Sequence, residues 1–489
     1  MVCRSRSYDD GRVTVVAGGG THGQDIFEKG VHAMSTFSEF QKQIRNTTKR
    51  QVIEMTLKLL SNVSEETFFK LTYLMERLVE GDTRENIRTV RAHLRQGEDD
   101  PATRLFKRVM SELSPHCLQR MAKTLFINSL VMSADVRDAF EREHGFRPPF
   151  TLLISPTMRC NLHCAGCYSG KYQQKPGLSY ETIDRILSEC EQLGTLFIVF
   201  SGGEPMMRKD ELFELIGKYR ELYFMFYTNG TLIDRDAAHR IGDLGNAGAV
   251  ISLEGFKEAT DRRRGDGTFD RIMDAFGHLK EFGVPFGTSI TVTRNNVEEV
   301  TSEAFYDMII ERGVMVLWYF LFMPVGKDPD TSLMPTPEQR EYLRQRDIYL
   351  RDRKTIFIAD FWNDAPHVGG CIAAGRNYMH INANGDVEPC VFAHHAVDNI
   401  DGKSLTEVLN SDFFKYIRSK QPYSENLLTP CQLIDHPEIW RDAVRKYHAY
   451  PTHLGAEDML NKISGELDDY SRRYRTLAAD IWDRDYVNT

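Results

Sequence analysis

The sequence contains no long hydrophobic run, no excess of positive charge and no apolar block near its N-terminus. The longest apolar run, 314–325, has 12 residues, whereas a membrane-spanning helix needs about 18 or more. The formal net charge of −9 gives no electrostatic reason to expect nucleic acid as a partner. Residues 1–24 lack the apolar core of a secretion signal. These absences predict a cytoplasmic protein without a transmembrane segment.

Cysteine is scarce, with nine residues among 489, and its spacing is informative. An odd number in a chain without a secretion signal favours metal or redox chemistry over a disulfide framework. Cys160, Cys164 and Cys167 share one short loop. Three thiolates so placed can hold three irons of a 4Fe-4S cluster and leave the fourth open to a ligand. The alternatives are a zinc site, which usually closes with four ligands, and three buried apolar cysteines.

The chain divides into five regions by pattern. Apolar residues at three- and four-residue steps predict helices in the second region, and two prolines at 148–149 end it. The last region is helical again. The predicted regions are a disordered tail at 1–29, a helical domain at 30–148, a strand-and-helix core at 149–364, a turn-rich extension at 365–450 and a C-terminal helix at 451–489.

Within the core, short apolar runs alternate with amphipathic helices. Six such units in series predict an α/β fold, a partial (β/α)6 barrel of parallel strands that binds ligands at the C-terminal ends of the strands. The predicted strands are 151–155, 196–201, 223–228, 249–253, 286–293 and 314–323. The predicted helices are 180–193, 210–221, 234–244, 269–282 and 298–312.

Polar and glycine-rich motifs follow the first four predicted strands. The cysteine loop follows the first, and Ser201-Gly202-Gly203-Glu204-Pro205 follows the second. Tyr227-Thr228-Asn229-Gly230 follows the third, and Ser252-Leu253-Glu254-Gly255 follows the fourth. Either of the last two could be a simple turn in isolation. Together and in this order, the motifs resemble those of the radical SAM superfamily.

The resemblance implies a cluster at Cys160, Cys164 and Cys167 that binds S-adenosylmethionine. A glycine pair would let the backbone approach that ligand. Arg264 would pair with the methionine carboxylate, unless the arginine run 262–264 is merely solvated. Two positions depart from the family: Gly166 stands where an aromatic residue is frequent, and Glu254 where relatives have Asp. The implied ligand contacts are Tyr168, Gly202, Gly203, Glu204, Pro205, Asn229, Ser252, Glu254 and Arg264.

A second cysteine set lies in the extension. Cys371, Gly385 and Cys390 are followed by Cys431, a pattern similar to the start of the SPASM and twitch extensions of radical SAM enzymes. The resemblance implies an auxiliary 4Fe-4S cluster with three cysteine ligands, and three ordinary cysteines are the alternative. Its fourth site would stay open for substrate or be filled by a side chain. The nearby candidates are Asp435, His436, His394 and His395. Around Asn384-Gly385 we expect a β-hairpin.

The resemblance implies reductive cleavage of S-adenosylmethionine to a 5'-deoxyadenosyl radical that takes hydrogen from an unactivated C–H bond. Flavodoxin or ferredoxin would supply the electron. The leading hypothesis is a maturase that modifies a peptide or protein. The alternatives are chemistry on lipid acyl chains, with segment 118–132 in peripheral contact with a membrane, and a non-catalytic electron carrier or scaffold. The candidates for substrate contact or catalysis are Tyr319, Asp360, Asn363, Asp364 and His367.

Overall fold

A computed structural model describes residues 69, 72–73, 76–77, 81–170, 176–326 and 329–487. The chain divides into two compact units, 1–56 and 57–489, and every described residue belongs to the second. The predicted disordered tail at 1–29 lies outside the described residues, as does most of the predicted helical stretch before residue 81.

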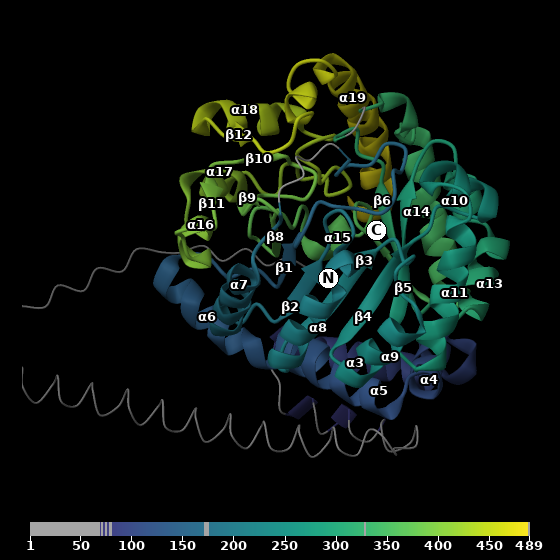
Figure 1. Cartoon of the computed structure of the whole chain (residues 1–489). Coiled ribbons are helices and arrows are strands. Elements are labelled where there is room, and N and C mark those ends of the chain that lie inside the picture. Colours follow the sequence, from purple (N-terminus) through teal and green to yellow (C-terminus); the bar gives the residue numbers. More distant parts are fainter. Residues whose placement is uncertain are drawn as a thin grey trace, which may run out of the picture. The chain divides into compact units, whose positions relative to one another are not determined.

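The core is a ten-stranded sheet with the order β11-β9-β8-β1-β2-β3-β4-β5-β6-β7 (Figure 1). The run β1 to β7 is parallel throughout. This confirms the predicted α/β fold and its six strands, and adds β7 as a seventh. The bounds are β1 Thr151–Ile154, β2 Phe197–Phe200, β3 Tyr223–Thr228, β4 Ala247–Ser252, β5 Phe286–Val292, β6 Val316–Leu321 and β7 Phe357–Asp360.

Helices join these strands, and side-chain caps fix where several of them begin. Ser179, Asp234 and Thr336 each accept a hydrogen bond from a backbone N–H of the first turn of α7, α9 and α14. The predicted helix 298–312 is two helices, because Ser302 caps a second start. The bounds are α7 Tyr180–Leu193, α8 Lys209–Lys218, α9 Arg235–Leu244, α10 Lys257–Arg264, α11 Thr268–Glu281, α12 Val297–Val300, α13 Glu303–Glu311 and α14 Pro337–Arg351.

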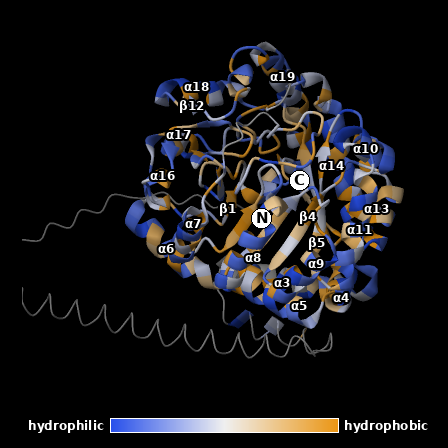
Figure 2. Ribbon diagram, viewed as in Figure 1, coloured by the Kyte–Doolittle hydropathy of each residue, from blue (hydrophilic) through white to orange (hydrophobic). Residues whose placement is uncertain are grey.

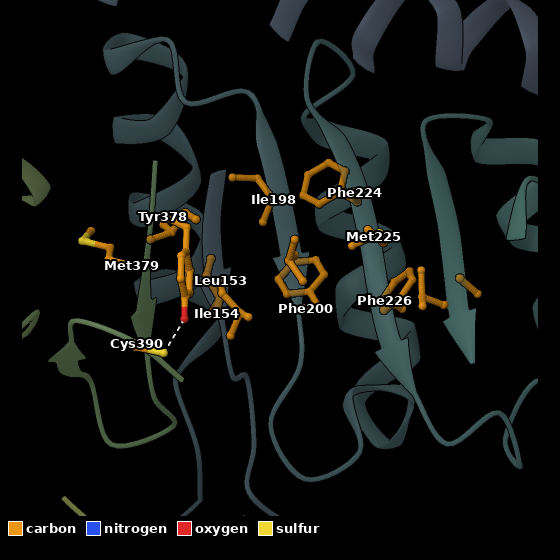
Figure 3. Close-up of a cluster of buried hydrophobic side chains, with 14 of the residues drawn as sticks. Leu153, Ile154, Ile198, Phe200, Phe224, Met225, Phe226, Tyr378, Met379 and Cys390 are labelled. Carbon is orange, nitrogen blue, oxygen red and sulfur yellow. Dashed lines mark hydrogen bonds between the residues drawn. The ribbon is translucent and has the colours of Figure 1, made fainter. Parts of the chain in front are cut away.

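The hydrophobic core lies between the sheet and these helices. Ile198, Phe200, Phe224 and Phe226 are buried side by side along β2 and β3 (Figure 3). The rings of Phe200 and Phe224 stack with centroids 5.6 Å apart. Burial of each such side chain contributes about 1.5–3 kcal/mol. Figure 2 shows the corresponding hydropathy, with apolar strands inside and polar residues on the outer faces of the helices.

The cysteine-rich extension continues the core sheet. Its first strand, β8 (Tyr378–Ile381), pairs in parallel with β1. The predicted hairpin is confirmed: β9 (Asp386–Glu388) runs antiparallel to β8, with Gly385 at a φ of +85° in the turn. The remaining elements are α15 Ala365–Val368, β10 His395–Ala396, β11 Asp398–Asn399, α16 Leu405–Leu409, α17 Asp412–Ser419, α18 Pro437–Tyr447, β12 Tyr450–Pro451 and α19 Ser464–Trp482.

The described N-terminal helices cover the end of the barrel at which the strands begin. Lys123 pairs with Glu221, just before β3, at 2.6 Å. Arg108 donates to the Thr355 carbonyl, just before β7, at 2.6 Å. Segment 118–132 therefore packs on the barrel. Across the described residues, no helix has the length and apolarity to cross a bilayer. The bounds are α3 Gly81–Gln96, α4 Pro101–Glu112, α5 Pro115–Met121 and α6 Ser133–His144, with a π-helical stretch Ala122–Met132.

Candidate functional site

The cysteine loop leaves β1 and is held by the glycine motif that follows β2. Gly203 donates its N–H to the Thr157 carbonyl at 3.0 Å, and Glu204 donates to the Arg159 carbonyl at 2.9 Å. A Cβ at Gly203 would lie only 2.3 Å from the Arg159 oxygen. A Cβ at Gly202, where φ is +112°, would lie 2.4 Å from the Thr157 oxygen. These glycines let two loops of the protein meet, and their expected role in the approach of the backbone to the ligand stays a prediction.

Glu204 ties the ends of β2 and β3 together. Its buried carboxylate accepts hydrogen bonds from Met206 N at 2.9 Å, Thr228 Oγ1 at 2.7 Å and Asn229 N at 2.8 Å. Burial raises the pKa of this carboxyl, and these donors oppose the rise. The Asn229 side chain then donates to Asn161 Oδ1 at 2.9 Å and approaches Cys160 Sγ at 3.8 Å. Glu204 thus positions Asn229 against the cysteine loop.

The three thiols of this loop interact electrostatically and are half-buried. Burial raises the pKa of Cys160 to about 11, and nearby Glu204, Cys164 and Cys167 contribute to the rise. Burial also raises the pKa of Cys164, whereas Arg264 lowers it. Iron binds thiolates, so loading would displace these protons. Three interacting thiols on one loop fit a cluster that takes each on a different iron.

The same thiols are not arranged around one point. Among the residues that the structure describes, no group of three His, Cys, Asp or Glu side chains could hold a single metal ion. This finding is compatible with a cluster, whose thiolates bind separate irons.

The departure at Gly166 has a structural reason. Gly166 adopts a φ of +62°, and a Cβ there would lie 2.7 Å from the ring of Phe322. An aromatic side chain from the end of β6 therefore fills the space beside the loop. Tyr168 turns the other way, and its hydroxyl lies 3.0 Å from Ser201 Oγ. Tyr168 thus contacts the loop that holds the glycine pair.

Glu254 and the end of α10 clamp the cysteine loop from the opposite side. Arg264 donates its Nε to Glu254 Oε1 at 2.9 Å, and Arg263 pairs with the same carboxylate at 2.6 Å. The Arg263 carbonyl accepts the N–H of Ala165 at 2.9 Å. Arg264 is therefore not part of a solvated run, although Arg262 is exposed.

Glu254 Oε2 has no hydrogen-bond partner within the described part of the chain. Ser252 lies nearby at the end of β4, 3.3 Å from Ser289 Oγ.

The second cysteine set comes together from three separate segments. Burial raises the pKa of Cys390 to about 12, and nearby Cys371 and Glu388 contribute to the rise. Burial raises the pKa of Cys431 well above its usual value, and Asp435, Cys371 and Cys390 add to this. The Tyr378 hydroxyl donates to Cys390 Sγ at 2.7 Å (Figure 3). The mutual effects show that the three thiols are neighbours, which fits an auxiliary cluster.

The four candidates for a fourth ligand occupy different environments. Asp435 is buried and pairs with Arg340 at 2.6 Å, and it accepts the Cys431 N–H at 3.0 Å. His436 Nε2 lies 3.1 Å from the Thr429 carbonyl, and His394 Nε2 lies 3.2 Å from the Val391 carbonyl. His395 is buried against Trp440. Asp435 is thus engaged by two other groups.

Comparisons with known proteins agree with this geometry. Residues 154–305 match the radical SAM superfamily, and residues 371–432 match an iron-sulfur cluster-binding domain. The mycofactocin maturase MftC of Mycobacterium tuberculosis is 30% identical over 57% of this chain and 75% of the relative. This chain belongs to the radical SAM superfamily. Its second cysteine set lies in the matched SPASM region.

Other radical SAM relatives differ in what their names say they act on. The Fe-coproporphyrin III synthase of Methanosarcina barkeri is 30% identical over 43% of this chain, and the match spans only 56% of that relative. The PqqA peptide cyclase of Granulibacter bethesdensis is 28% identical over 60% of this chain and 81% of the relative. Streptococcus suis SuiB, solved with its precursor peptide SuiA, shares the fold with a TM-score of 0.52 at 19% identity, covering 66% and 77% of the chains.

Aromatic rings line the interior of the radical SAM barrel. Along β6, half-buried Trp318 and Phe320 alternate with fully buried neighbours. Phe320 contacts Tyr227 of β3 with centroids 5.7 Å apart, although β4 and β5 separate these strands in the sheet. Rings on non-adjacent strands can meet only across the interior. Phe361, which follows β7, lies 5.4 Å from Phe320. Only the pairing of the strands shows which rings of β6 face inward.

Two of the predicted substrate contacts, Tyr319 and Asp360, do not face this interior, which corrects the expectation for them, whereas Asn363, Asp364 and His367 stay predictions. Tyr319 alternates with Trp318 and Phe320, so it points to the helices, where its hydroxyl donates to the Val300 carbonyl at 2.7 Å. Asp360 faces α14 in the same way, and its carboxylate accepts from Asn363 Nδ2 at 2.8 Å. Asp364 pairs with Arg351 of α14 at 2.7 Å, and His367 is exposed.

Proposed function

We propose that this protein is a radical SAM maturase that modifies a side chain of a peptide or protein. The observation that carries the reaction class is the cysteine loop, gripped by Gly203 and Glu204 on one side and by Arg263 on the other. Cys160, Cys164 and Cys167 would hold the cluster that binds S-adenosylmethionine. Cys371, Cys390 and Cys431 would hold an auxiliary one. When bound, the first cluster supplies the electron that cleaves S-adenosylmethionine.

The residues around the loop have separate proposed tasks. The backbone of 202–205 would receive the methionine end of the ligand, because Glu204 and the glycine pair fix its course beside the thiols. Glu254 would accept a hydrogen bond from S-adenosylmethionine at its second carboxylate oxygen, which is buried without a partner in the described residues. Arg264 holds the other oxygen of this carboxylate. Asn229 and Ser252 end neighbouring strands and would contact the nucleoside.

The peptide assignment is supported by relatives and by the second thiol set. A peptide cyclase and a maturase are among the relatives that match most of their own length. The barrel interior is lined by half-buried rings, which suits an uncharged side chain of a substrate. Segment 118–132, the expected membrane contact of the lipid alternative, packs on the barrel. A reductant of the flavodoxin or ferredoxin type would supply the electron.

Anaerobic reconstitution with iron and sulfide tests the reaction class. We expect about eight irons per chain, as two cubanes require, and 5'-deoxyadenosine on reduction. Cys190→Ala, at a buried core position, is the matched control. This variant should keep both the iron content and the formation of 5'-deoxyadenosine. Iron-loaded protein that forms no 5'-deoxyadenosine under reduction would instead support the carrier or scaffold alternative.

Co-expression tests the substrate class. The gene is expressed with short peptides encoded beside it, and the peptides are analysed by mass spectrometry. A mass change that disappears when Cys160, Cys164 and Cys167 are replaced by Ala supports the maturase. A protein that forms 5'-deoxyadenosine but co-purifies with acyl chains, and changes no peptide, would favour the lipid alternative.

A further inference from the structure

Tyr378 joins the barrel interior to the second thiol set. It lies on β8 with 5% of its surface exposed, and its hydroxyl donates to Cys390 Sγ at 2.7 Å (Figure 3). Its ring contacts Phe361 edge-on, with centroids 6.1 Å apart. Phe361 in turn contacts Phe320 inside the barrel. One side chain therefore touches both the aromatic lining and a predicted cluster ligand.

The direction of the hydrogen bond to sulfur is fixed by a second contact. The N–H of Val391 donates to the Tyr378 oxygen at 3.2 Å. That oxygen is therefore an acceptor for Val391, and its own proton is left for Cys390. Because both groups are buried, the bond lies in a medium of low dielectric constant, where it is stronger than in water.

A second tyrosine near the same thiols makes an instructive contrast. Tyr423 lies close enough to Cys371 to interact with its thiol. However, its hydroxyl donates to Gln432 Oε1 at 3.1 Å and accepts from Gln421 Nε2 at 3.3 Å. Its proton therefore has an amide oxygen as an acceptor in addition to the Cys371 thiol, whereas the proton of Tyr378 is directed at the sulfur of Cys390.

We propose that Tyr378 is a positioning residue that raises the reduction potential of the auxiliary cluster through its O–H···S hydrogen bond to Cys390. A donor at a ligating sulfur stabilises the reduced cluster, which carries more negative charge, more than the oxidised one. Tyr378 thereby makes the auxiliary cluster a better electron acceptor than its cysteine ligands alone would. The inference rests on the proposed assignment of Cys371, Cys390 and Cys431 as ligands.

The test is a redox titration followed by electron paramagnetic resonance on the full-length, anaerobically reconstituted protein. Tyr378→Phe removes the hydroxyl and keeps the ring contact with Phe361. We expect the midpoint potential of the auxiliary cluster to shift downward while that of the other cluster and the iron content stay unchanged. Tyr219→Phe is the matched control, because this buried hydroxyl donates to the Asp184 carbonyl at 2.7 Å in a different part of the barrel. It should shift neither potential.

A second variant keeps the test decisive if the phenylalanine protein loads poorly. Incorporation of 3-fluorotyrosine at position 378 makes the phenol a stronger donor, so the auxiliary potential should rise. Tyr423→Phe should produce a smaller shift than Tyr378→Phe. Eight irons with an unchanged auxiliary potential, or equal shifts in both clusters, would overturn the role of Tyr378 alone. Four irons per chain in the parent protein would overturn it together with the auxiliary-cluster assignment.

Discussion

The two thiol sets of this protein are built in opposite ways. Cys160, Cys164 and Cys167 lie within one loop, and the neighbouring motifs hold that loop by its backbone. Cys371, Cys390 and Cys431 come from three segments, and the first two cysteines flank the β8–β9 hairpin. A local site depends on the shape of one loop, whereas a distant one depends on the whole fold around it. The two should therefore respond differently to the same kind of change.

Their surroundings differ in charge and in hydrogen bonding. Arg264 lies near Cys164 and favours its ionised form. Asp435 lies near Cys431 and disfavours ionisation, while Tyr378 donates to Cys390. The first set is half-buried, as are Cys371 and Cys431 of the second set, whereas Cys390 is buried.

The largest expected effect comes from removing each thiol set in turn. Replacing Cys160, Cys164 and Cys167 by Ala should abolish formation of 5'-deoxyadenosine and remove about four irons per chain. Replacing Cys371, Cys390 and Cys431 by Ala should also remove about four irons but leave cleavage of S-adenosylmethionine measurable. Iron counting and chromatography of the products check both. Equal loss of cleavage in the two triple variants would show that the sites do not act separately.

Adding a methyl group at Gly203 should disrupt the first thiol set and leave the second one intact. In Gly203→Ala the new Cβ would meet the Met158 and Arg159 carbonyl oxygens at 2.5 and 2.3 Å, so the cysteine loop must move. We expect a loss of the cluster that binds S-adenosylmethionine, with the auxiliary cluster retained, as judged from the two paramagnetic signals. Gly277→Ala is the matched control, because nothing lies within 4 Å of a Cβ there and helical Ala is favoured. Retention of both signals in Gly203→Ala would refute the backbone clamp.

Breaking the buried ion pair beside Cys431 should destabilise the protein strongly. Arg340 and Asp435 are buried, and the guanidinium lies 3.3 Å from the centre of the Tyr474 ring. Arg340→Met leaves Asp435 buried without its partner, which costs about 3–5 kcal/mol of unfolding free energy. The double variant Arg340→Met, Asp435→Leu should recover part of this loss. Exposed Arg473, replaced by Met, should change the free energy by less than about 1 kcal/mol. Urea denaturation measures the unfolding free energy of all three variants.

The smallest effect concerns pH, through a histidine in the extension. Burial lowers the pKa of His395 to about 4, whereas an unfolded histidine has a pKa near 6.5. Above pH 6.5 both states are neutral. As the pH falls from 6.5 towards 4, the unfolded chain takes up the proton first, so stability is lost. Between pH 7 and pH 5 this loss amounts to about 2 kcal/mol.

His395→Phe should remove that part of the pH dependence, measured as the difference in unfolding free energy between pH 7 and pH 5. If His395→Phe left the pH dependence as large as in the parent protein, the loss would have to come from other groups.

The sequence by itself determined the cysteine loop, the six strands of the core and the motifs after them. These features depend on local spacing and on short-range periodicity, which the chain carries in its own order. The hairpin at Asn384-Gly385 was readable for the same reason. The division of the chain into five regions and the cytoplasmic location stay predictions.

Only the tertiary structure decided which side chains face the barrel interior and which distant segments lie together. A period of two along β6 marks two faces but does not say which one is inside, so Tyr319 was expected at the substrate and lies against helices instead, as does Asp360 at the end of β7. The pairing of β8 with β1 joins residues more than two hundred positions apart in the chain. Such long-range contacts depend on how whole elements pack, and they place Tyr378 on the sulfur of Cys390.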